Sequence, residues 1–305
     1  MEKAIVTGAS GFIGKNLVKY LLNKGFYVLA IVRNKDNMKD ILSFSNLKIF
    51  EADLNEYKIL DTKIKENSFN VFFHVAWAGV DKSSFYNYEQ QIDNIKYTCD
   101  ALILARKLKC KKFIFIGSFV EYEVRKYIEE DTKDLRIATT YGMSKLTSEI
   151  FLKTLVNQYN DINLNIIYPA QVYGEGDKSK TLSRILIESF IRNKCPKLVE
   201  GNFLYDWIYI KDLIEGIIAV YYRGKNKKGY YIGHRKIKLF KDFIIEIKNI
   251  IAPDIILKFG EYPDNANIDY SKINLDDLYN DTGFEIKSNF KQTIKNTELW
   301  IRKNI

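Results

Sequence analysis

Two residues near the middle of the chain have the types and the spacing of an acid–base pair. Tyr141 and Lys145 lie four positions apart in TTYGMSKLTSE, residues 139–149. On a helix, side chains at this spacing share one face. A free tyrosine, with a pKa of about 10, is a poor acid at neutral pH, but a nearby ammonium favours its phenolate and lowers that pKa. The pair could equally be surface polarity in a chain with 47 lysines and arginines, so the surrounding pattern decides.

A glycine-rich stretch at the start of the chain predicts a phosphate-binding turn. VTGASGFIG, residues 6–14, follows an apolar run and opens a stretch typical of a helix. Its G-x-x-G-x-x-G spacing allows a tight turn, and the helix N-terminus offers unpaired N–H groups to a pyrophosphate. A glycine-rich turn without a ligand is the alternative. The predicted cofactor contacts from this turn are Gly8, Ser10, Gly11, Phe12, Ile13 and Gly14.

The end of the next apolar run bears on the choice of cofactor. NAD-preferring sites usually place an acidic residue there, which accepts hydrogen bonds from the ribose 2′-hydroxyl. This chain has Val32 at that position and Arg33 next to it, and a guanidinium suits a 2′-phosphate. The sequence therefore favours NADP(H), with NAD(H) as the alternative. Asp53 and Leu54, after the following strand, are expected to frame the adenine.

Short apolar runs alternate with longer helical stretches through the first half of the chain. Strands are predicted within residues 3–8, 26–33, 47–54, 71–79, 111–118 and 163–174, and helices within residues 12–25, 88–109 and 141–158. This alternation predicts an α/β fold with a doubly wound parallel sheet of the Rossmann type. On the last of these helices, Leu146, Ile150, Phe151 and Leu155 are expected to form one apolar packing face.

The alternation breaks after about residue 170, where loop-like stretches such as GEGDKSKT and EYPDNANIDYSK occur. We predict a dinucleotide-binding domain over residues 1–170 plus about 206–232. Residues 171–205 plus about 233–305 are expected to form a smaller C-terminal α/β substrate-binding lobe. A strand and a helix in DWIYIKDLIEGIIAVYYRG, residues 206–224, should return the chain to the main domain.

Composition narrows the class of protein. No apolar run approaches the roughly 18 residues that a membrane span needs, and the N-terminus lacks the pattern of a secretory signal. The three cysteines fit reduced thiols, so we expect a cytoplasmic protein with no membrane partner and no metal. The lysines behind the net charge of +9 are scattered, which argues against nucleic acid and is compatible with a small anionic ligand.

A series of motifs along the chain resembles one family. TGASGFIG, ADL, HVAWAG, GSFVEY, YGMSK, YPAQVYGEGD and DWIYIKDL occur in this order, and DYSKINLDDLYNDTGFEI extends the likeness to residue 286. Together they resemble the extended short-chain dehydrogenase/reductase family, in particular its nucleotide-sugar branch of epimerases, dehydratases and 4-ketoreductases. The likeness spans almost the whole chain, so it is more specific than the tyrosine–lysine pair alone.

The resemblance implies roles for three residues. Ser118 takes the place of the family's catalytic serine or threonine, and Tyr141 and Lys145 match its tyrosine and lysine. In a ketone reduction NADPH would deliver hydride, Tyr141 would protonate the developing alkoxide, and Ser118 would hydrogen-bond the same oxygen. Lys145 would hold the nicotinamide ribose and tune Tyr141. Further cofactor contacts are expected from Val75, Ala76, Trp77, Asn94 and Tyr168.

The family's reactions differ in what they require. Its 4,6-dehydratases usually carry Thr-Asp-Glu after the fifth strand, where this chain has Ser118-Phe119-Val120. Its C4-epimerases typically keep NAD and an acid on the second strand, where Arg33 stands. An NADPH-dependent 4-ketoreductase of a nucleotide-linked deoxysugar is therefore favoured. A C4-epimerase or 4-dehydrogenase, a reductase of a non-sugar carbonyl and a non-catalytic NAD(P)-binding protein are the alternatives.

Two departures from the family concern the substrate diphosphate. Gln171 stands where an asparagine is common, and Tyr205 stands where an arginine is common. Lys178 or Arg184 could supply the missing charge. The predicted substrate contacts are Ser118, Gln171, Lys178, Arg184 and Tyr205. The family often pairs through its two long helices, here residues 88–108 and 141–158, so the resemblance implies a homodimer.

Overall fold

A computed structural model describes residues 1–305 except 81–83, 132, 134, 137, 180 and 263–267. Its centre is a seven-stranded sheet in the order β10-β6-β5-β4-β1-β2-β3, and every pairing within it is parallel. The strands are β1 (Lys3–Thr7), β2 (Tyr27–Val32), β3 (Leu47–Glu51), β4 (Val71–His74), β5 (Lys112–Ile116), β6 (Asn163–Pro169) and β10 (Lys228–Ile232). This confirms the predicted doubly wound sheet, whose strand order reverses beside β1.

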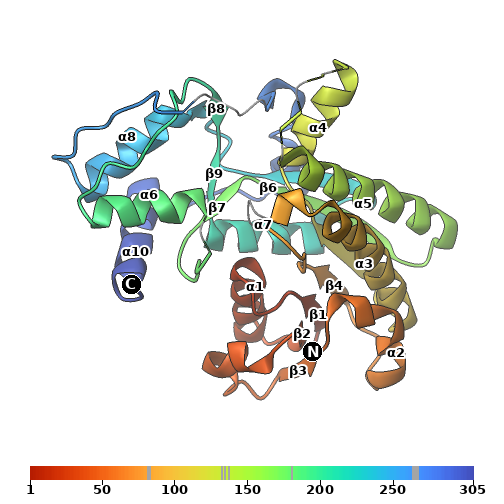
Figure 1. Ribbon diagram of the computed structural model, residues 1–305. Coiled ribbons are helices and arrows are strands. Elements are labelled where there is room, and N and C mark those ends of the chain that lie inside the picture. The colour runs from red at the N-terminus through yellow and green to blue at the C-terminus, as the bar shows by residue number, and fades with distance from the viewer. Residues whose placement is uncertain (81–83, 132, 134, 137, 180, 263–267) are drawn as a thin grey trace.

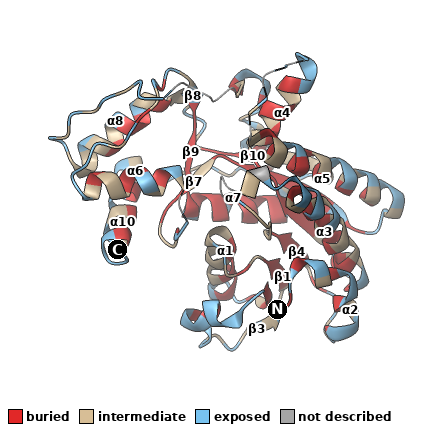
Figure 2. Cartoon of the chain, viewed as in Figure 1, coloured by how far each residue is buried: buried red, intermediate tan, exposed pale blue. Residues whose placement is uncertain are grey.

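Helices cover both faces of the sheet (Figure 1). α1 (Phe12–Asn23) packs against α7 (Ile210–Arg223), while α3 (Tyr88–Lys107) packs against α5 (Ala138–Tyr159). Shorter segments complete this part of the chain: η1 (Lys35–Ile41), η2 (Leu54–Ile59), α2 (Leu60–Lys63), η3 (Ser84–Tyr86) and α4 (Val120–Glu129). The central strands β1, β4 and β5 read as nearly continuous apolar runs because both of their faces are buried, whereas the edge strand β3 is partly exposed (Figure 2).

The predicted apolar face of α5 is only partly correct. Leu146 is buried, but Ile150 and Phe151 are about half exposed, at 56% and 50%. The inner face of this helix instead carries Lys145 and Glu149 together with small and apolar side chains. Because Tyr141, Lys145 and Glu149 are spaced by four, turning the first two inward also buries the third.

The C-terminal part of the chain is more regular than the sequence suggests. Three helices pack together there, and two small sheets pair β7 with β9 and β8 with β11 (Figure 1). The elements are β7 (Gln171–Tyr173), α6 (Leu182–Ile191), β8 (Leu204–Tyr205), β9 (Trp207–Tyr209), β11 (Lys238–Leu239), α8 (Phe240–Ile251), η4 (Tyr270–Lys272), α9 (Asp277–Thr282) and α10 (Phe290–Arg302). The boundary between the two lobes stays a prediction.

Three sequence expectations for this part have different outcomes. The strand and helix expected in residues 206–224 form as β9 and α7, but β9 pairs with β7 rather than with the main sheet. Much of the loop expected in EYPDNANIDYSK lies outside the described residues. Within the described part of the chain, no helix is both long and apolar enough to cross a membrane.

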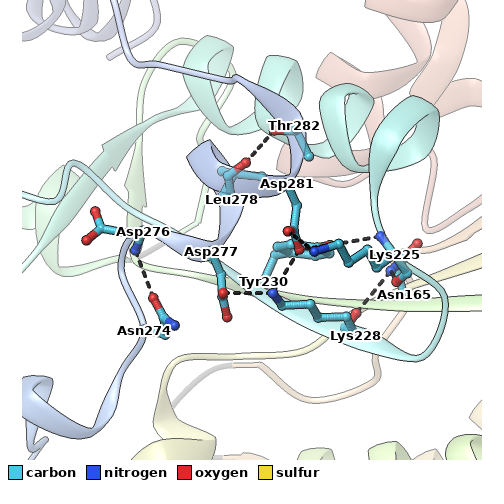
Figure 3. A network of polar contacts seen from close by, with 10 residues as sticks. All are labelled: Asn165, Lys225, Lys228, Tyr230, Asn274, Asp276, Asp277, Leu278, Asp281 and Thr282. Atoms are coloured by element: carbon cyan, nitrogen blue, oxygen red, sulfur yellow. Dashed lines mark hydrogen bonds and ion pairs between the residues drawn. The ribbon is translucent and has the colours of Figure 1, made fainter.

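An ion-pair network fastens the edge strand β10 to α9 (Figure 3). Lys228 Nζ donates to Asp277 at 2.7 Å and to Asp281 at 2.8 Å, and Tyr230 Oη donates to Asp281 at 2.8 Å. Lys225 Nζ lies 2.5 Å from the other oxygen of Asp281. Burial alone would raise the pKa of Asp281, but these donors hold it well below its usual value. Asp281 therefore supports the exposed edge of the sheet as an anion.

Replacing Asp281 by Asn should destabilise the protein by about 1–3 kcal/mol, because Lys225, Lys228 and Tyr230 lose a charged acceptor. The carboxyl's pKa is depressed in the folded state, so its contribution is present above the unfolded aspartate pKa of about 4 and is lost as the pH falls. Urea unfolding at neutral and at acid pH measures both effects. Asp276→Asn, at an exposed pair with Arg235, is the matched control and should change little. An equal loss in both variants would contradict the assignment.

Candidate active site

The carboxyl ends of β1, β4, β5 and β6 meet at one edge of the sheet, because all four strands are parallel neighbours. This edge lies at the point where the strand order reverses, which is where open α/β sheets bind their ligands. The glycine turn follows β1, the loop 75–79 follows β4, and Ser118 follows β5. The residues predicted from separate motifs therefore converge here.

The glycine turn leaves no room for side chains. Gly8 has φ +63°, and a Cβ on it would lie 2.8 Å from the backbone of Ala76. A Cβ on Gly14 would lie 2.2 Å from the carbonyl oxygen of Gly8. Gly11 is the N-cap of α1 and has no side chain to satisfy the first N–H groups of the helix. These features fit the pyrophosphate of a dinucleotide, with Ser10, Phe12 and Ile13 half-buried around the turn.

At the adenosine end of this edge, Arg33 follows β2 directly and is exposed. It makes no ion pair with any residue that the structure describes, so its guanidinium is available to an anionic ligand. Asp53 caps η2, accepting the N–H of Leu54 at 2.7 Å, and Leu54 is buried. The adenine contacts expected of Asp53 and Leu54 stay a prediction.

The loop after β4 is held from both sides. Thr7 Oγ1 accepts the N–H groups of Val75 and Ala76 at 3.2 and 3.3 Å. From α3, Asn94 accepts the N–H of Ala78 at 2.9 Å and donates to its carbonyl at 2.8 Å. Asn94 thus fixes this loop, and the direct cofactor contact expected of it stays a prediction.

Trp77 forms one wall of the site. Its Nε1 donates to Gln91 at 3.0 Å, and Gln91 in turn donates to the carbonyl of Gly79 at 2.9 Å. The Nζ of Lys145 lies 3.8 Å from the centroid of the Trp77 ring. The indole therefore stabilises the buried ammonium through a cation–π contact.

The three expected catalytic side chains come together. Ser118 lies close enough to Tyr141 for its hydroxyl to lower the pKa of the phenol. Lys145 Nζ donates to the carbonyl of Ile116 at 2.7 Å, and it lies 5.9 Å from the centroid of the Tyr141 ring. The hydrogen bond of Lys145 Nζ is therefore to the backbone of β5, with the Tyr141 ring nearby.

Burial shifts both titratable groups. It raises the pKa of Tyr141 above its ordinary value, with the Ser118 hydroxyl acting in the opposite direction. It lowers the pKa of Lys145 to about 7, with Glu121 acting in the opposite direction. A second cation at this edge of the sheet would oppose the rise of the Tyr141 pKa. At neutral pH the phenol of Tyr141 thus keeps its proton, and Lys145 is present in both its charged and its neutral form.

A second aromatic ring, which the sequence did not single out, covers Tyr141. Phe85 in η3 stacks on the Tyr141 ring at 5.1 Å between centroids, and Trp77 meets it edge-on at 5.9 Å. These rings limit the access of water to the phenol. Phe85 precedes α3 in a stretch without a recognisable motif, so no sequence signal identified it.

The structure connects some of the substrate residues predicted from the sequence, since Phe119, next to Ser118, packs on the Tyr205 ring. Tyr205 is buried, and its Oη donates to Gln171 Oε1 at 3.3 Å. Arg184 pairs with Glu188 at 2.6 Å and also donates to the carbonyl of Asp177. Lys178 is exposed. The hydroxyl of Tyr168 donates to Glu149 at 2.7 Å, and the cofactor contact expected of its backbone stays a prediction.

Metal chemistry receives no support from side-chain clustering, since no group of three or more His, Cys, Asp or Glu side chains among the described residues could hold an ion. His74, the one histidine near the site, is buried and bonded to Thr7 and Thr98. Burial and then Lys145 lower its pKa to about 3, so it is neutral. It therefore serves packing at the end of β4.

Comparison with known proteins finds a family model and relatives that match this chain. The sequence model of the NAD dependent epimerase/dehydratase family matches residues 4–233. The chain is 28% identical to the "Putative UDP-glucose 4-epimerase" of Methanocaldococcus jannaschii, over 68% of this chain and 70% of that protein.

Two solved structures have the same fold. The UDP-N-acetylglucosamine 4-epimerase of Methanobrevibacter ruminantium, in complex with UDP-N-acetylmuramic acid, aligns with a TM-score of 0.82 at 20% identity, over 100% of this chain and 99% of that one. The dTDP-glucose 4,6-dehydratase of Bacillus anthracis, in complex with NAD, aligns at 0.79 and 21% identity, over 100% and 97%. At these identities the likeness concerns the fold.

The pyrophosphate site predicted at the glycine turn can be tested with two glycine substitutions. Gly14→Ala should weaken NADPH binding at least tenfold, because its Cβ would displace the Gly8 carbonyl and deform the turn. Titration of NADPH fluorescence measures the affinity. Gly25→Ala is the control, since its positive φ strains an alanine while its Cβ meets no atom within 4 Å. It should lower stability by about 1–2 kcal/mol and leave the affinity unchanged. Unchanged binding by Gly14→Ala would place the cofactor elsewhere.

Proposed function

The chain belongs to the NAD dependent epimerase/dehydratase family, and within that family we propose that it reduces the 4-keto group of a nucleotide-linked deoxysugar with NADPH. The observation that carries this proposal is the convergence of Ser118, Tyr141 and Lys145 beside the glycine turn. Phe119 and Val120 follow Ser118, at the positions where the family's dehydratases carry an acid and a base. The site thus suits proton donation to an oxygen better than elimination of water.

Each side chain has a separate task in the proposed reduction. NADPH, when bound, supplies the hydride that adds to the carbonyl carbon. Ser118 donates a hydrogen bond to the carbonyl oxygen, and Tyr141 transfers its phenolic proton to that oxygen as negative charge develops. The charge of Lys145 stabilises the resulting phenolate, which then regains a proton from solvent. The balance is one ketone, one hydride and one proton converted into one alcohol.

Support for NADPH comes from the end of β2. Val32 stands where an acid would accept the 2′-hydroxyl of NAD, and Arg33 is exposed and makes no ion pair with a described residue. A 2′-phosphate would give this guanidinium a charged, forked partner. NAD(H) is the alternative, since the similar dehydratase structure holds NAD.

A second candidate is an NAD-dependent C4-epimerase or 4-dehydrogenase of nucleotide sugars. The observation in its favour is the 28% identity to a protein described as a putative UDP-glucose 4-epimerase. The same trio can run in the opposite direction, with Tyr141 accepting the proton of a 4-hydroxyl. The absence of an acid after β2 favours net reduction.

Two further alternatives have less support. The neutral Tyr205, in place of an arginine, is compatible with a non-sugar carbonyl substrate, but the VYGEGD and DYSK stretches resemble the nucleotide-sugar branch. A non-catalytic NAD(P)-binding protein has no use for the buried trio. Diphosphate contacts by Gln171, Tyr205, Lys178 or Arg184 are part of the proposal.

We expect the purified protein to oxidise NADPH with at least one nucleotide-linked 4-keto-6-deoxysugar, and NADH much more slowly. Tyr141→Phe should reduce kcat by about 10²–10⁴-fold, because the alkoxide loses its proton donor while the ring still fills its place. Stopped-flow absorbance of the reduced cofactor measures the rates.

Arg33→Ser provides the matched control for the cofactor. It should raise the KM for NADPH by about tenfold or more and leave that for NADH unchanged, because only the 2′-phosphate loses a partner. A wild-type preference for NADH would overturn the NADPH assignment alone. No oxidation of either cofactor, with NAD recovered from the denatured protein, would favour the epimerase or 4-dehydrogenase.

We also propose that the protein is a homodimer in the cytoplasm. α3 leaves Tyr88 and Ile92 more than half exposed, and α5 leaves Met143, Ile150 and Phe151 about half exposed. Apolar side chains gathered on two adjoining helices are typical of an interface. The described cysteines are free thiols, which suits a reducing compartment.

Light scattering should therefore give a mass of twice 35.7 kDa. Phe151→Glu should produce a monomer, because a dimer would bury its carboxylate without a partner. Ile128→Glu, at an exposed position on α4, is the control and should leave the mass unchanged. A wild-type monomer would contradict the proposal.

A further inference from the structure

A second carboxyl group lies behind the trio and has no role in the reduction described above. Glu121, in the first turn of α4, is completely buried, and its Oε1 accepts the backbone N–H of Ser118 at 2.7 Å. A Cβ on Gly117 would lie 2.4 Å from this same oxygen. The carboxyl thus fills the space that a side chain at residue 117 would need. Glu121 thereby fixes the turn that presents Ser118.

Glu149 lies near Glu121 and is held in its anionic form by three hydrogen-bond donors. It is 2% exposed and accepts hydrogen bonds from Arg125 at 2.9 Å, Lys153 at 2.6 Å and Tyr168 at 2.7 Å. Burial alone would raise its pKa, but Lys153 and Arg125 lower it. With three donors from α4, α5 and β6, Glu149 holds a negative charge.

Glu121 has the opposite environment. Burial, and then the charge of Glu149, raise its pKa well above the ordinary glutamate value. Its Oε2 is buried and has no hydrogen-bond partner among the described residues, and Glu149 is near enough to act on its pKa. Two neighbouring buried carboxylates cannot readily both stay ionised. An O–H on Oε2 directed at Glu149 satisfies that otherwise unpartnered oxygen.

We propose that Glu121 is a positioning residue that stays protonated at neutral pH, donating its proton to Glu149 while it holds Ser118 in place. The neutral form does this without setting a negative charge beside Tyr141 and Lys145. An ionised Glu121 would raise the pKa of Tyr141 and make it a weaker proton donor. The presence of the proton does not depend on the proposed reduction, whereas its effect on turnover does.

The charges facing this carboxyl are known from each neighbouring element. They are Arg125 and Tyr122 on α4, Tyr141, Lys145 and Glu149 on α5, and Tyr168 on β6, with Lys153 acting through Glu149 and Asp277 on α9 through Tyr122. A raised carboxyl pKa costs folding stability above the unfolded glutamate pKa of about 4, and the cost grows until the folded group ionises. Glu121→Gln, which keeps both an acceptor and a donor, should therefore be at least as stable as wild type at neutral pH.

Infrared spectroscopy tests for the proton directly and needs no substrate. At about pH 8.5 ordinary carboxyl groups are ionised, and so is Asp206, whose pKa burial raises to about 7. The wild-type protein should retain one carboxylic acid C=O band that shifts in D₂O, and Glu121→Gln should lack it. Glu123→Gln is the matched control: Glu123 is equally buried on the same helix, but it accepts from Arg136 and Tyr127, so the band should persist.

Failure of Glu121→Gln to fold would not end the test, since Glu149→Gln changes the acceptor of the same proton and should shift the wild-type band. Absence of the band in wild type, or its survival in Glu121→Gln, would overturn the inference whatever the activity. With an active substrate, Glu121→Gln should keep kcat within about threefold at neutral pH and lose the wild-type decline at high pH. Glu121→Leu, which cannot accept from Ser118, should lose at least tenfold. A protein inactive with every nucleotide sugar but carrying the band would overturn the proposed reduction and leave this inference standing.

Discussion

Withdrawal of the Lys145 ammonium from water is the constraint around which the rest of the site is arranged. Desolvation lowers its pKa to about 7, with Glu121 acting in the opposite direction, and Nζ contacts the Ile116 carbonyl and the rings of Trp77 and Phe115. All three partners are uncharged. Lys145 can therefore gain and lose its proton near neutral pH. A fixed salt bridge to a carboxylate would hold it protonated.

Uncharged groups also hold the backbone around this lysine. Neutral His74 joins Thr7 to Thr98, and Thr7 in turn accepts two N–H groups of the loop after β4. The fixed charges lie one layer further out, where Glu149 meets Arg125 and Lys153. Coulomb interactions are strong in a desolvated interior, and Glu121 is the carboxyl that acts on the pKa of both Tyr141 and Lys145. Its protonation, as inferred above, would keep the inner layer neutral.

The sequence predicted those parts of the site that local chemistry determines. Gly8, Gly11 and Gly14, and the spacing of Tyr141 and Lys145, follow from turn geometry and helix periodicity, and the alternating elements predicted the sheet. Contacts between distant segments were not predictable. Phe85 stacks on Tyr141 from across the fold, and Glu121 reads as a surface glutamate until Glu149 is placed beside it. The apolar face predicted for α5 was partly wrong for a related reason. The face that the helix buries is the one that carries the polar site residues Lys145 and Glu149, while Ile150 and Phe151 are half exposed.

The substitution of Tyr205 for an arginine is part of a repacked wall rather than an isolated lost contact. Phe119, Phe203, Trp207 and Phe240 surround the Tyr205 ring, with centroids 5.1–6.5 Å apart within the cluster. Burial raises the pKa of Tyr205, so it is a neutral hydrogen-bonding group paired with Gln171. A guanidinium in the same place would be buried among these rings, where the charges that act on this position are already paired as Glu123 and Arg136, and its desolvation would be costly. The aromatic cluster and an arginine are therefore alternatives. Under the proposed function, a substrate phosphate would draw its charge compensation from outside this wall.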